Sequence, residues 1–163
     1  MLSISAPFIP EFFKDQLDSV LPYADYVFCN ETEAQTYSKT HDWDTDNDIP
    51  SIAKKLSQLP KKNTKRPRVA VVTQGTLPTV TATTKSNGEI DVQEFPVRKV
   101  AESSINDTNG AGDAFAGGFA AGVVLKKSLL ESVKMGKWLA SLSIQELGAS
   151  FPSPKQVYDP EKV

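Results

Sequence analysis

Apolar residues along the chain occur either in short continuous runs or at helical spacing, and the order in which these two patterns alternate predicts the fold class. Short apolar runs at 1–4, 25–29 and 69–73 have the length of buried strands, whereas apolar residues recur at helical spacing over 8–21 and 49–59. A strand as continuously apolar as 69–73 is typical of a parallel sheet that is covered on both faces. We therefore expect an α/β fold in which helices connect parallel strands.

Two helix starts are marked by polar residues. Asn30 and Glu33 have the spacing of a capping box, which predicts a helix that continues to Thr40. Asp48, two residues before Pro50, predicts the start of the next helix.

The last part of the chain predicts an edge hairpin and two more helices. Residues 79–84 and 90–95 flank the turn Ser86-Asn-Gly88, which is typical of a hairpin added antiparallel at the edge of a sheet. The two expected helices span 112–125 and 129–147, the second ended by Gly148. Because no repeat or flexible linker interrupts the pattern, we expect one compact unit.

Composition narrows the functional classes. The 163 residues include 39% hydrophobic and 23% charged residues, which is ordinary for a folded domain. The net charge of −2 creates no global field for nucleic acid or an anionic membrane, and no apolar run reaches the roughly 20 residues that span a bilayer. The single cysteine, Cys29, excludes an internal disulfide framework and fits a reducing compartment. We therefore expect a cytoplasmic protein, with the nucleus as a second compartment, that binds neither nucleic acid nor membrane.

Three further patterns suggest functions but fit structural roles better. The acidic residues from Asp42 onward resemble a calcium loop, but Asn47 and Ala53 stand where such a loop needs Gly and Glu. The basic residues over 61–68 have no interleaved aromatic residues, and we expect a solvated loop there. Trp138, on the last expected helix, is predicted to lie in the core.

The segment Asn106–Phe119 carries the strongest candidate chemistry. A dinucleotide-binding fingerprint would need a small residue at 115, where Phe115 stands. A P-loop would need Lys and then Ser or Thr after Gly117, where Gly118 and Phe119 stand. The segment therefore lacks residues that each of these two phosphate-binding motifs requires.

A third interpretation of the segment is an anion site at the start of a helix. Gly110, Ala111 and Gly112 would present successive N–H groups at a helix N-terminus, where the peptide dipoles favour an anion. Asp113 follows in the first turn, where it could accept the proton of an attacking hydroxyl group, so the pattern predicts phosphoryl transfer. The structural alternative is that Asp107 and Asp113 only cap a helix whose Gly117-Gly118 pair packs closely against a neighbour.

The wider pattern resembles a known family. Asp107-Thr-Asn-Gly-Ala-Gly-Asp113 is similar to the D-T-x-G-A-G-D signature of the ribokinase-like sugar and nucleoside kinases. Around it, in the order of the adenosine-phosphorylating members, stand Ser5-Ala-Pro-Phe8, Asn30-Glu-Thr-Glu-Ala34, Thr73-Gln-Gly75 and Gly148 to Pro152. The resemblance implies a ribokinase-like three-layer α/β/α sandwich. This chain would be its C-terminal half, with parallel strands, an edge hairpin and flanking helices.

The same resemblance implies an activity and a role for particular residues. The implied reaction is ATP-dependent phosphorylation of adenosine at the 5′-hydroxyl to give AMP, a step of purine salvage, with Mg²⁺ required. Asp113 would be the general base, and Gly110, Ala111 and Gly112 would form the anion hole. The residues implied to bind ATP or its phosphates are Asn30, Thr73, Gly75, Thr108, Asn109, Lys137, Ser141 and Ile144. Glu33 would organise Mg²⁺ through water.

Members of this family are much longer than this chain. We expect residues 1–163 to be the ATP-binding and catalytic part, without the N-terminal half, the lid and most adenosine contacts. The chain could be a truncated form, a proteolytic fragment, or a piece that pairs with a separate N-terminal half; the full-length family form is expected to be a monomer. Alone, the chain should be weakly active or inactive. A non-catalytic nucleotide- or partner-binding fragment and a related sugar kinase stay open as alternatives.

Overall fold

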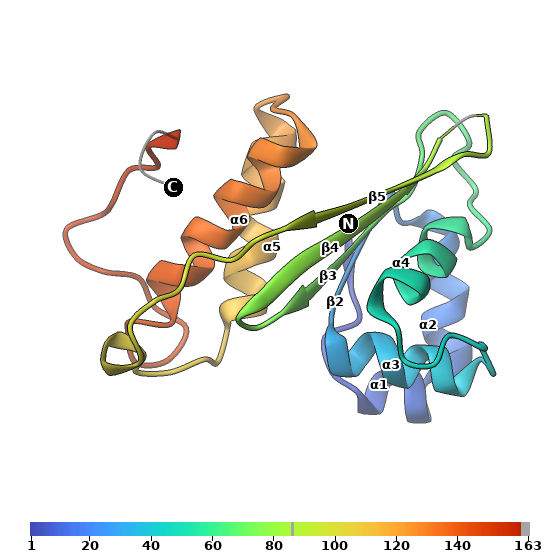
Figure 1. The fold of residues 1–163 in the computed structure, drawn as a ribbon, viewed down its shortest axis with the longest axis horizontal. Coiled ribbons are helices and arrows are strands. Elements are labelled where there is room, and N and C mark those ends of the chain that lie inside the picture. Colours follow the sequence, from blue (N-terminus) through green and yellow to red (C-terminus); the bar gives the residue numbers. More distant parts are fainter. Residues whose placement is uncertain (86, 161–163) are drawn as a thin grey trace. The chain divides into compact units, whose positions relative to one another are not determined.

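The computed structural model describes residues 1–85 and 87–160, which group into two compact units divided after Pro96 (Figure 1). The sequence pattern predicted one compact unit, and the structure differs in this respect. That the two units together form the catalytic part of one kinase domain stays a prediction.

The first unit is built around a mixed five-stranded sheet with strand order β1-β2-β3-β4-β5. The strands are β1 (Leu2–Ser3), β2 (Tyr26–Asn30), β3 (Val69–Gln74), β4 (Leu77–Thr84) and β5 (Ile90–Phe95). The first three strands are parallel, and β4 and β5 form an antiparallel hairpin at one edge. The predicted α/β class, parallel strands and edge hairpin are therefore confirmed, although Ser86 of the expected turn lies outside the described residues.

Two helices of the first unit cover one face of this sheet (Figure 1). They are α3 (Glu31–Thr40) and α4 (Ile49–Gln58), whose starts are capped by Asn30 and Asp48 as the sequence predicted. Alternate strand residues such as Val27, Val72 and Ala82 join helix residues in one hydrophobic core cluster. Burial of these side chains is the main force that holds the helices on the sheet.

The segment predicted as one helix over 8–21 is broken. It forms two short helices and a 3₁₀ turn, α1 (Phe8–Phe12), α2 (Lys14–Val20) and η1 (Leu21–Tyr23). Phe13, between α1 and α2, has φ −127° and ψ 35°, outside the helical region. Leu17 and Leu21 are buried, but Phe8 and Phe12 are more than half exposed. The apolar spacing therefore identified the buried leucines and wrongly extended one helix through the exposed phenylalanines.

Among residues 1–85 and 87–160, Arg68 is the largest fully buried side chain, and the expectation that it belongs to a solvated basic loop is wrong. Its guanidinium donates to the carbonyl oxygens of Ala24 (3.2 Å), Leu21 (2.7 Å), Pro60 (2.9 Å) and Leu59. A guanidinium carries five N–H donors, so one side chain can satisfy several carbonyl groups that have left regular structure. Arg68 thus joins the end of α4 to the turn that precedes β2.

The second unit consists of η2 (Glu102–Ser104), two long helices, α5 (Ala111–Val124) and α6 (Leu129–Ser143), and a C-terminal tail. The helices pack closely through glycine. A Cβ atom on Gly118 would lie 2.8 Å from the carbonyl carbon of Met135 and 2.9 Å from the Cα atom of Gly136. Of the pair Gly117 and Gly118, predicted to pack closely against a neighbour, only Gly118 does so, since a Cβ atom on Gly117 would lie 3.9 Å from Leu139 Cδ2.

Helix α6 ends four residues earlier than the sequence predicted. In a continuing helix, the Gly148 N–H would donate to the Ile144 carbonyl. Instead, the Gly148 N–H donates to Asp107 Oδ2 (3.1 Å), and the Ile144 carbonyl accepts from the Asn106 N–H (2.8 Å). Bonds from a loop distant in sequence thus replace the last turn of the helix.

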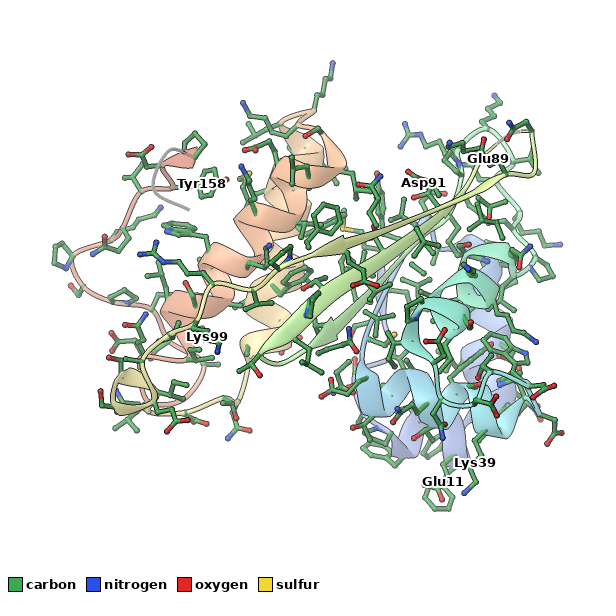
Figure 2. All side chains as sticks on the ribbon, viewed as in Figure 1. Glu11, Lys39, Glu89, Asp91, Lys99 and Tyr158 are labelled. Carbon is green, nitrogen blue, oxygen red and sulfur yellow. The ribbon has the colours of Figure 1, made fainter. Side chains whose placement is uncertain are left out.

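The C-terminal tail returns along α6. Tyr158, labelled in Figure 2, lies in this tail. Its hydroxyl donates to Glu131 Oε2 (3.3 Å), and its ring packs edge-on against Trp138. Trp138 is half-buried rather than a core residue, so the expectation of a core position is only partly met. Within residues 1–85 and 87–160, no helix has both the length and the apolar character needed to cross a membrane.

Replacing Arg68 by alanine should lower the free energy of unfolding by about 3 kcal/mol or more, because several carbonyl groups lose a charged donor at once. Urea unfolding of the chain measures this effect. Arg66→Ala is the matched control, since Arg66 is exposed and should change stability by no more than about 0.5 kcal/mol. Equal effects of the two substitutions would contradict the role of Arg68.

Two adjacent glycines of α5 should respond oppositely to alanine. Gly118→Ala should destabilise the chain by about 1–3 kcal/mol or more, because the new methyl group meets backbone atoms of α6 that cannot move aside easily. Gly117→Ala should be neutral or stabilising by about 0.5–1 kcal/mol, since the nearest atom, Leu139 Cδ2, would lie 3.9 Å away and alanine favours helix. Thermal unfolding followed by circular dichroism separates the two, and a mild effect at Gly118 would show that the helices do not pack as described.

Candidate phosphate-binding and catalytic site

The start of α5 requires glycine at its N-cap. Gly110 has φ +78°, in the left-handed region that residues with a Cβ atom seldom adopt. A Cβ atom there would also lie 3.0 Å from the Cβ atom of Ala149. Both the backbone conformation and the space beside it therefore fit glycine.

Helix α5 is the only helix of ten or more residues in the described part of the chain whose start has no side-chain cap. The corresponding helices α3, α4 and α6 are capped by the side chains of Asn30, Asp48 and Ser128. The first N–H groups of a helix have no partner within the helix, so those of α5 are not taken up by a capping side chain. Of the predicted anion-hole residues, Ala111 makes a long backbone bond to the Thr108 carbonyl (3.3 Å). This helix start has the polarity and the donors that suit an oxyanion.

Asp113 lies in the first turn of α5, is exposed, and borders a cavity of about 340 Å³. The cavity is lined by Gly110, Asp113, Ala114, Gly117, Leu139, Ser143, Ala149 and Phe151. The predicted base and one predicted anion-hole residue therefore share one cavity of the second unit. A carboxylate in this position can accept the proton of a hydroxyl group bound there.

Asp107 has a different role from the cap that the structural alternative assigned to it. Its Oδ1 accepts from the Asn109 N–H (2.9 Å), and its Oδ2 accepts from the Gly148 N–H. These backbone hydrogen bonds hold the pKa of the Asp107 carboxyl below its ordinary value, and the bond from Asn109 has the largest effect. Asp107 thus shapes the loop that contains Thr108 and Asn109, which are both exposed, and joins it to the C-terminal tail.

A second group of predicted residues gathers in the first unit, where β2 and β3 end. Asn30, the last residue of β2, is paired in register with Thr73 of β3. Gly75 follows with φ +55° in the turn that leads to β4. Because β2 and β3 are parallel, their carboxyl ends lie side by side, and these residues follow one another there. Open α/β sheets bind ligands beyond the carboxyl ends of their strands.

Asn30 and Glu33 form a complete capping box. Asn30 Oδ1 accepts from the Glu33 N–H (2.8 Å), Glu33 Oε2 accepts from the Asn30 N–H (3.0 Å), and Glu33 Oε1 accepts from Asn30 Nδ2 (2.9 Å). Burial is the main cause that raises the pKa of Glu33, and the bond from the Asn30 backbone opposes it. The structural explanation of this motif is therefore confirmed.

The residues of this site fit Mg²⁺ binding through water rather than direct coordination by side chains. Across the described residues, no group of three or more His, Cys, Asp or Glu side chains could hold a metal ion. Glu33 is buried and each of its carboxylate oxygens already accepts one hydrogen bond, which leaves lone pairs that can accept from a water. Mg²⁺ commonly keeps several waters and binds through substrate phosphates, so an outer-sphere role of Glu33 fits.

The three residues assigned to an adenine pocket share one face of α6 or its end. Lys137, Ser141 and Ile144 follow one another at helical spacing and are half-buried. Burial is the first cause that lowers the pKa of Lys137, with nearby Lys134 second. The Ser141 hydroxyl already donates to the Trp138 carbonyl (2.7 Å), so its oxygen remains as an acceptor. Binding of ATP by this face stays a prediction.

The sequence predicted a site role for only two of the residues that line the cavity, Gly110 and Asp113; the others are Ala114, Gly117, Leu139, Ser143, Ala149 and Phe151. Ser143 comes from α6, whereas Ala149 and Phe151 come from the tail. Helical spacing along α6 could have placed Ser143 on the face that packs against α5, and Ala149 and Phe151 belong to the segment Gly148–Pro152, which the resemblance singled out without assigning it a role in the site. The acidic loop, in contrast, behaves as predicted, since Asp48 accepts from the Ser51 N–H (2.9 Å) as the cap of α4.

Comparisons with known proteins identify the family of the chain. The family described as "pfkB family carbohydrate kinase" matches residues 1–156. Adenosine kinase 2 of Arabidopsis thaliana is 46% identical over 151 residues, and adenosine kinase of Saccharomyces cerevisiae is 43% identical over 159 residues. These alignments cover 93% and 97% of this chain but only 42% and 44% of the relatives.

A solved structure shows the same fold. Adenosine kinase of Anopheles gambiae, in complex with P1,P4-di(adenosine-5) tetraphosphate, matches with a TM-score of 0.84 and 40% identity, over 94% of this chain and 45% of that structure. This match confirms the predicted ribokinase-like fold class. The chain spans less than half the length of these relatives. Since the family pattern matches nearly all of its residues, the chain belongs to the pfkB family of carbohydrate kinases.

Proposed function

We propose that the chain is the ATP-binding and catalytic part of a kinase that phosphorylates adenosine at its 5′-hydroxyl to give AMP in purine salvage. The observation that carries the proposal is the start of α5, where no side chain caps the helix and Asp113 lies in the first turn, on the wall of a cavity. The similarity to proteins named adenosine kinase supports adenosine as the acceptor.

The reaction assigns distinct tasks to the residues of the second unit. Asp113 accepts the proton of the acceptor's hydroxyl group. The hydroxyl oxygen of the acceptor attacks the terminal phosphorus of ATP, and the bond between that phosphorus and the leaving ADP oxygen breaks. The N–H groups at Gly110–Gly112 stabilise the charge on the transferring phosphoryl oxygens, helped by the dipole of α5. Thr108 and Asn109 belong to the loop held by Asp107 and are proposed to contact the phosphates.

The first unit would contribute to nucleotide binding. Asn30, Thr73 and Gly75, together at the ends of β2 and β3, are proposed to hold the phosphates of ATP. Glu33 would orient a water of Mg²⁺, an ion that neutralises phosphate charge when it is bound. Lys137, Ser141 and Ile144 of the second unit are proposed to contact the adenine ring of ATP.

Because the chain spans less than half the length of its relatives, the proposed reaction needs parts that this chain does not contain. Residues of the relatives that have no counterpart here would supply a lid and most adenosine contacts, so a separate N-terminal half is the proposed partner. The two alternatives, a sugar kinase and a non-catalytic nucleotide-binding fragment, are distinguished by the acceptor used once such a half is added. A cytoplasmic location, with the nucleus as a second compartment, and a monomeric full-length form remain part of the proposal.

Asp113→Asn should remove catalysis and spare nucleotide binding. In the chain complemented with the N-terminal half of a related adenosine kinase, turnover should fall by about 10²–10⁴, because the amide cannot accept the hydroxyl proton. Affinity for magnesium-ATP, measured by calorimetric titration, should stay within about threefold. Glu102→Gln, at the exposed η2 turn, is the control and should retain full turnover. A mutant at Asp113 that keeps more than a tenth of the rate would exclude it as the base.

The unaccompanied 163-residue chain should phosphorylate adenosine at least about 10²-fold more slowly than the complemented form. The reason is that much of the rate of such a reaction comes from holding both substrates in one orientation inside a closed site. A coupled assay of ADP release, with and without the added N-terminal half, measures the difference. Equal rates would show that residues 1–163 contain everything the reaction needs.

A further inference from the structure

A row of polar residues stands where the three parallel strands of the first unit end. Asn30 of β2 is paired with Thr73 of β3. On the other side of β2, Ser3 of β1 is paired with Phe28, and this register, continued by two residues, brings Ser5 to the level of Asn30. The residue before each member of the row lies in the hydrophobic core cluster: Ile4, Cys29 and Val72. The row therefore begins where the buried part of the sheet ends.

Ser5 has a backbone conformation that is unusual for serine. Its φ of +69° lies in the left-handed region, which residues with a Cβ atom seldom adopt. The Ala6 N–H donates to the Ile4 carbonyl (2.9 Å) and so closes a three-residue turn around Ser5. Turns of this kind with a positive φ are strained, and glycine would adopt this φ at lower cost. Because strained residues cluster at functional sites, a serine at this strand end requires an explanation.

The two hydroxyl groups of the row are held only weakly. Ser5 Oγ donates to the Ser3 carbonyl at 3.3 Å, and Thr73 Oγ1 donates to the Cys29 carbonyl at 3.5 Å. Hydroxyl donors usually lie about 2.7–2.8 Å from their acceptors, so both bonds are long. Asn30, which stands between the two, uses its side chain in the capping box of α3. The hydroxyl groups of Ser5 and Thr73 can therefore exchange a long internal bond for a ligand oxygen at little cost.

We propose that the Ser5 hydroxyl donates a hydrogen bond to the phosphate chain of ATP, on the opposite side of Asn30 from Thr73. This inference rests on the proposed function, which assigns the ends of β2 and β3 to the nucleotide phosphates. Two strand spacings, roughly 10 Å, separate β1 from β3, which is more than one phosphate group spans. The ligand class is therefore a nucleoside polyphosphate with its metal ion and the waters of that ion. The strained turn fixes the hydroxyl at the strand end, which gives serine a reason to replace glycine there.

The test measures affinity for magnesium-ATP by titration calorimetry and the thermal unfolding midpoint without nucleotide, both on the 163-residue chain. Ser5→Gly should weaken binding by about 3- to 10-fold, the effect of one lost hydrogen bond. The same substitution should raise the unfolding midpoint by about 1–3 °C, because glycine relieves the strain of a positive φ. Ser5→Ala should weaken binding equally without raising the midpoint, since alanine removes the hydroxyl group and keeps the strain.

The matched control is Lys126→Gly. Lys126 is exposed, has φ +56°, and follows the end of α5 that is opposite to Gly110. Glycine should therefore raise the midpoint here as well, while affinity for magnesium-ATP stays within about twofold. A gain in stability with a loss of affinity at Ser5, and a gain in stability alone at Lys126, separates a binding role from a purely structural one.

Three results would overturn the inference: affinity within about twofold after Ser5→Gly, a lower midpoint for that variant, or an equal loss of affinity with Lys126→Gly. Thr73→Ala, titrated in parallel, separates this failure from that of the proposed function. If Thr73→Ala weakens binding and Ser5→Gly does not, the nucleotide site is retained and only the role of Ser5 is rejected. If the unaltered chain does not bind magnesium-ATP, the inference is also overturned. The assay of ADP release with an added N-terminal half then shows whether the proposed function fails with it.

Discussion

The close approach of α5 and α6 is the constraint on which the candidate site depends. Gly118 and Gly122 leave no room for a side chain, so the backbone of α6 determines where α5 lies. The position of the first turn of α5, with its uncapped N–H groups and Asp113, follows from this packing. A rigid helix pair can hold donors and a carboxylate in fixed positions, which is what electrostatic stabilisation of a transferring group requires.

The loops at this end of the helix pair are fixed by one carboxylate. Asp107 accepts from backbone N–H groups on both sides, at Asn109 and at Gly148, and so joins the loop before α5 to the tail after α6. The two carboxylates on either side of the glycine turn therefore have different roles. Asp107 uses its charge on backbone donors within the loop, whereas Asp113 makes no cap bond and faces the cavity.

Much of the fold was predictable because its signals are local. The capping box at Asn30 and Glu33, the cap at Asp48, and the hairpin flanks each depend on residues within a few positions of one another. The features that were missed depend on distant contacts. Arg68 bonds to Leu21, 47 positions away, and the early end of α6 depends on Asp107, 41 positions from Gly148. The apolar pattern of a single segment contains no information on contacts between distant residues. For the same reason, the sequence did not predict that Ser143 and Asp113 line one cavity.

The predicted site residues divide between the two units, and this division bears on activity. Asn30, Thr73 and Gly75 belong to the sheet unit, whereas the turn at Gly110 and Asp113 belong to the helix-pair unit. Phosphoryl transfer requires little covalent chemistry from the protein and depends mainly on positioning and on charge stabilisation. A catalyst of this kind gains its rate from the mutual orientation of its parts, so well-formed local sites are necessary without being sufficient.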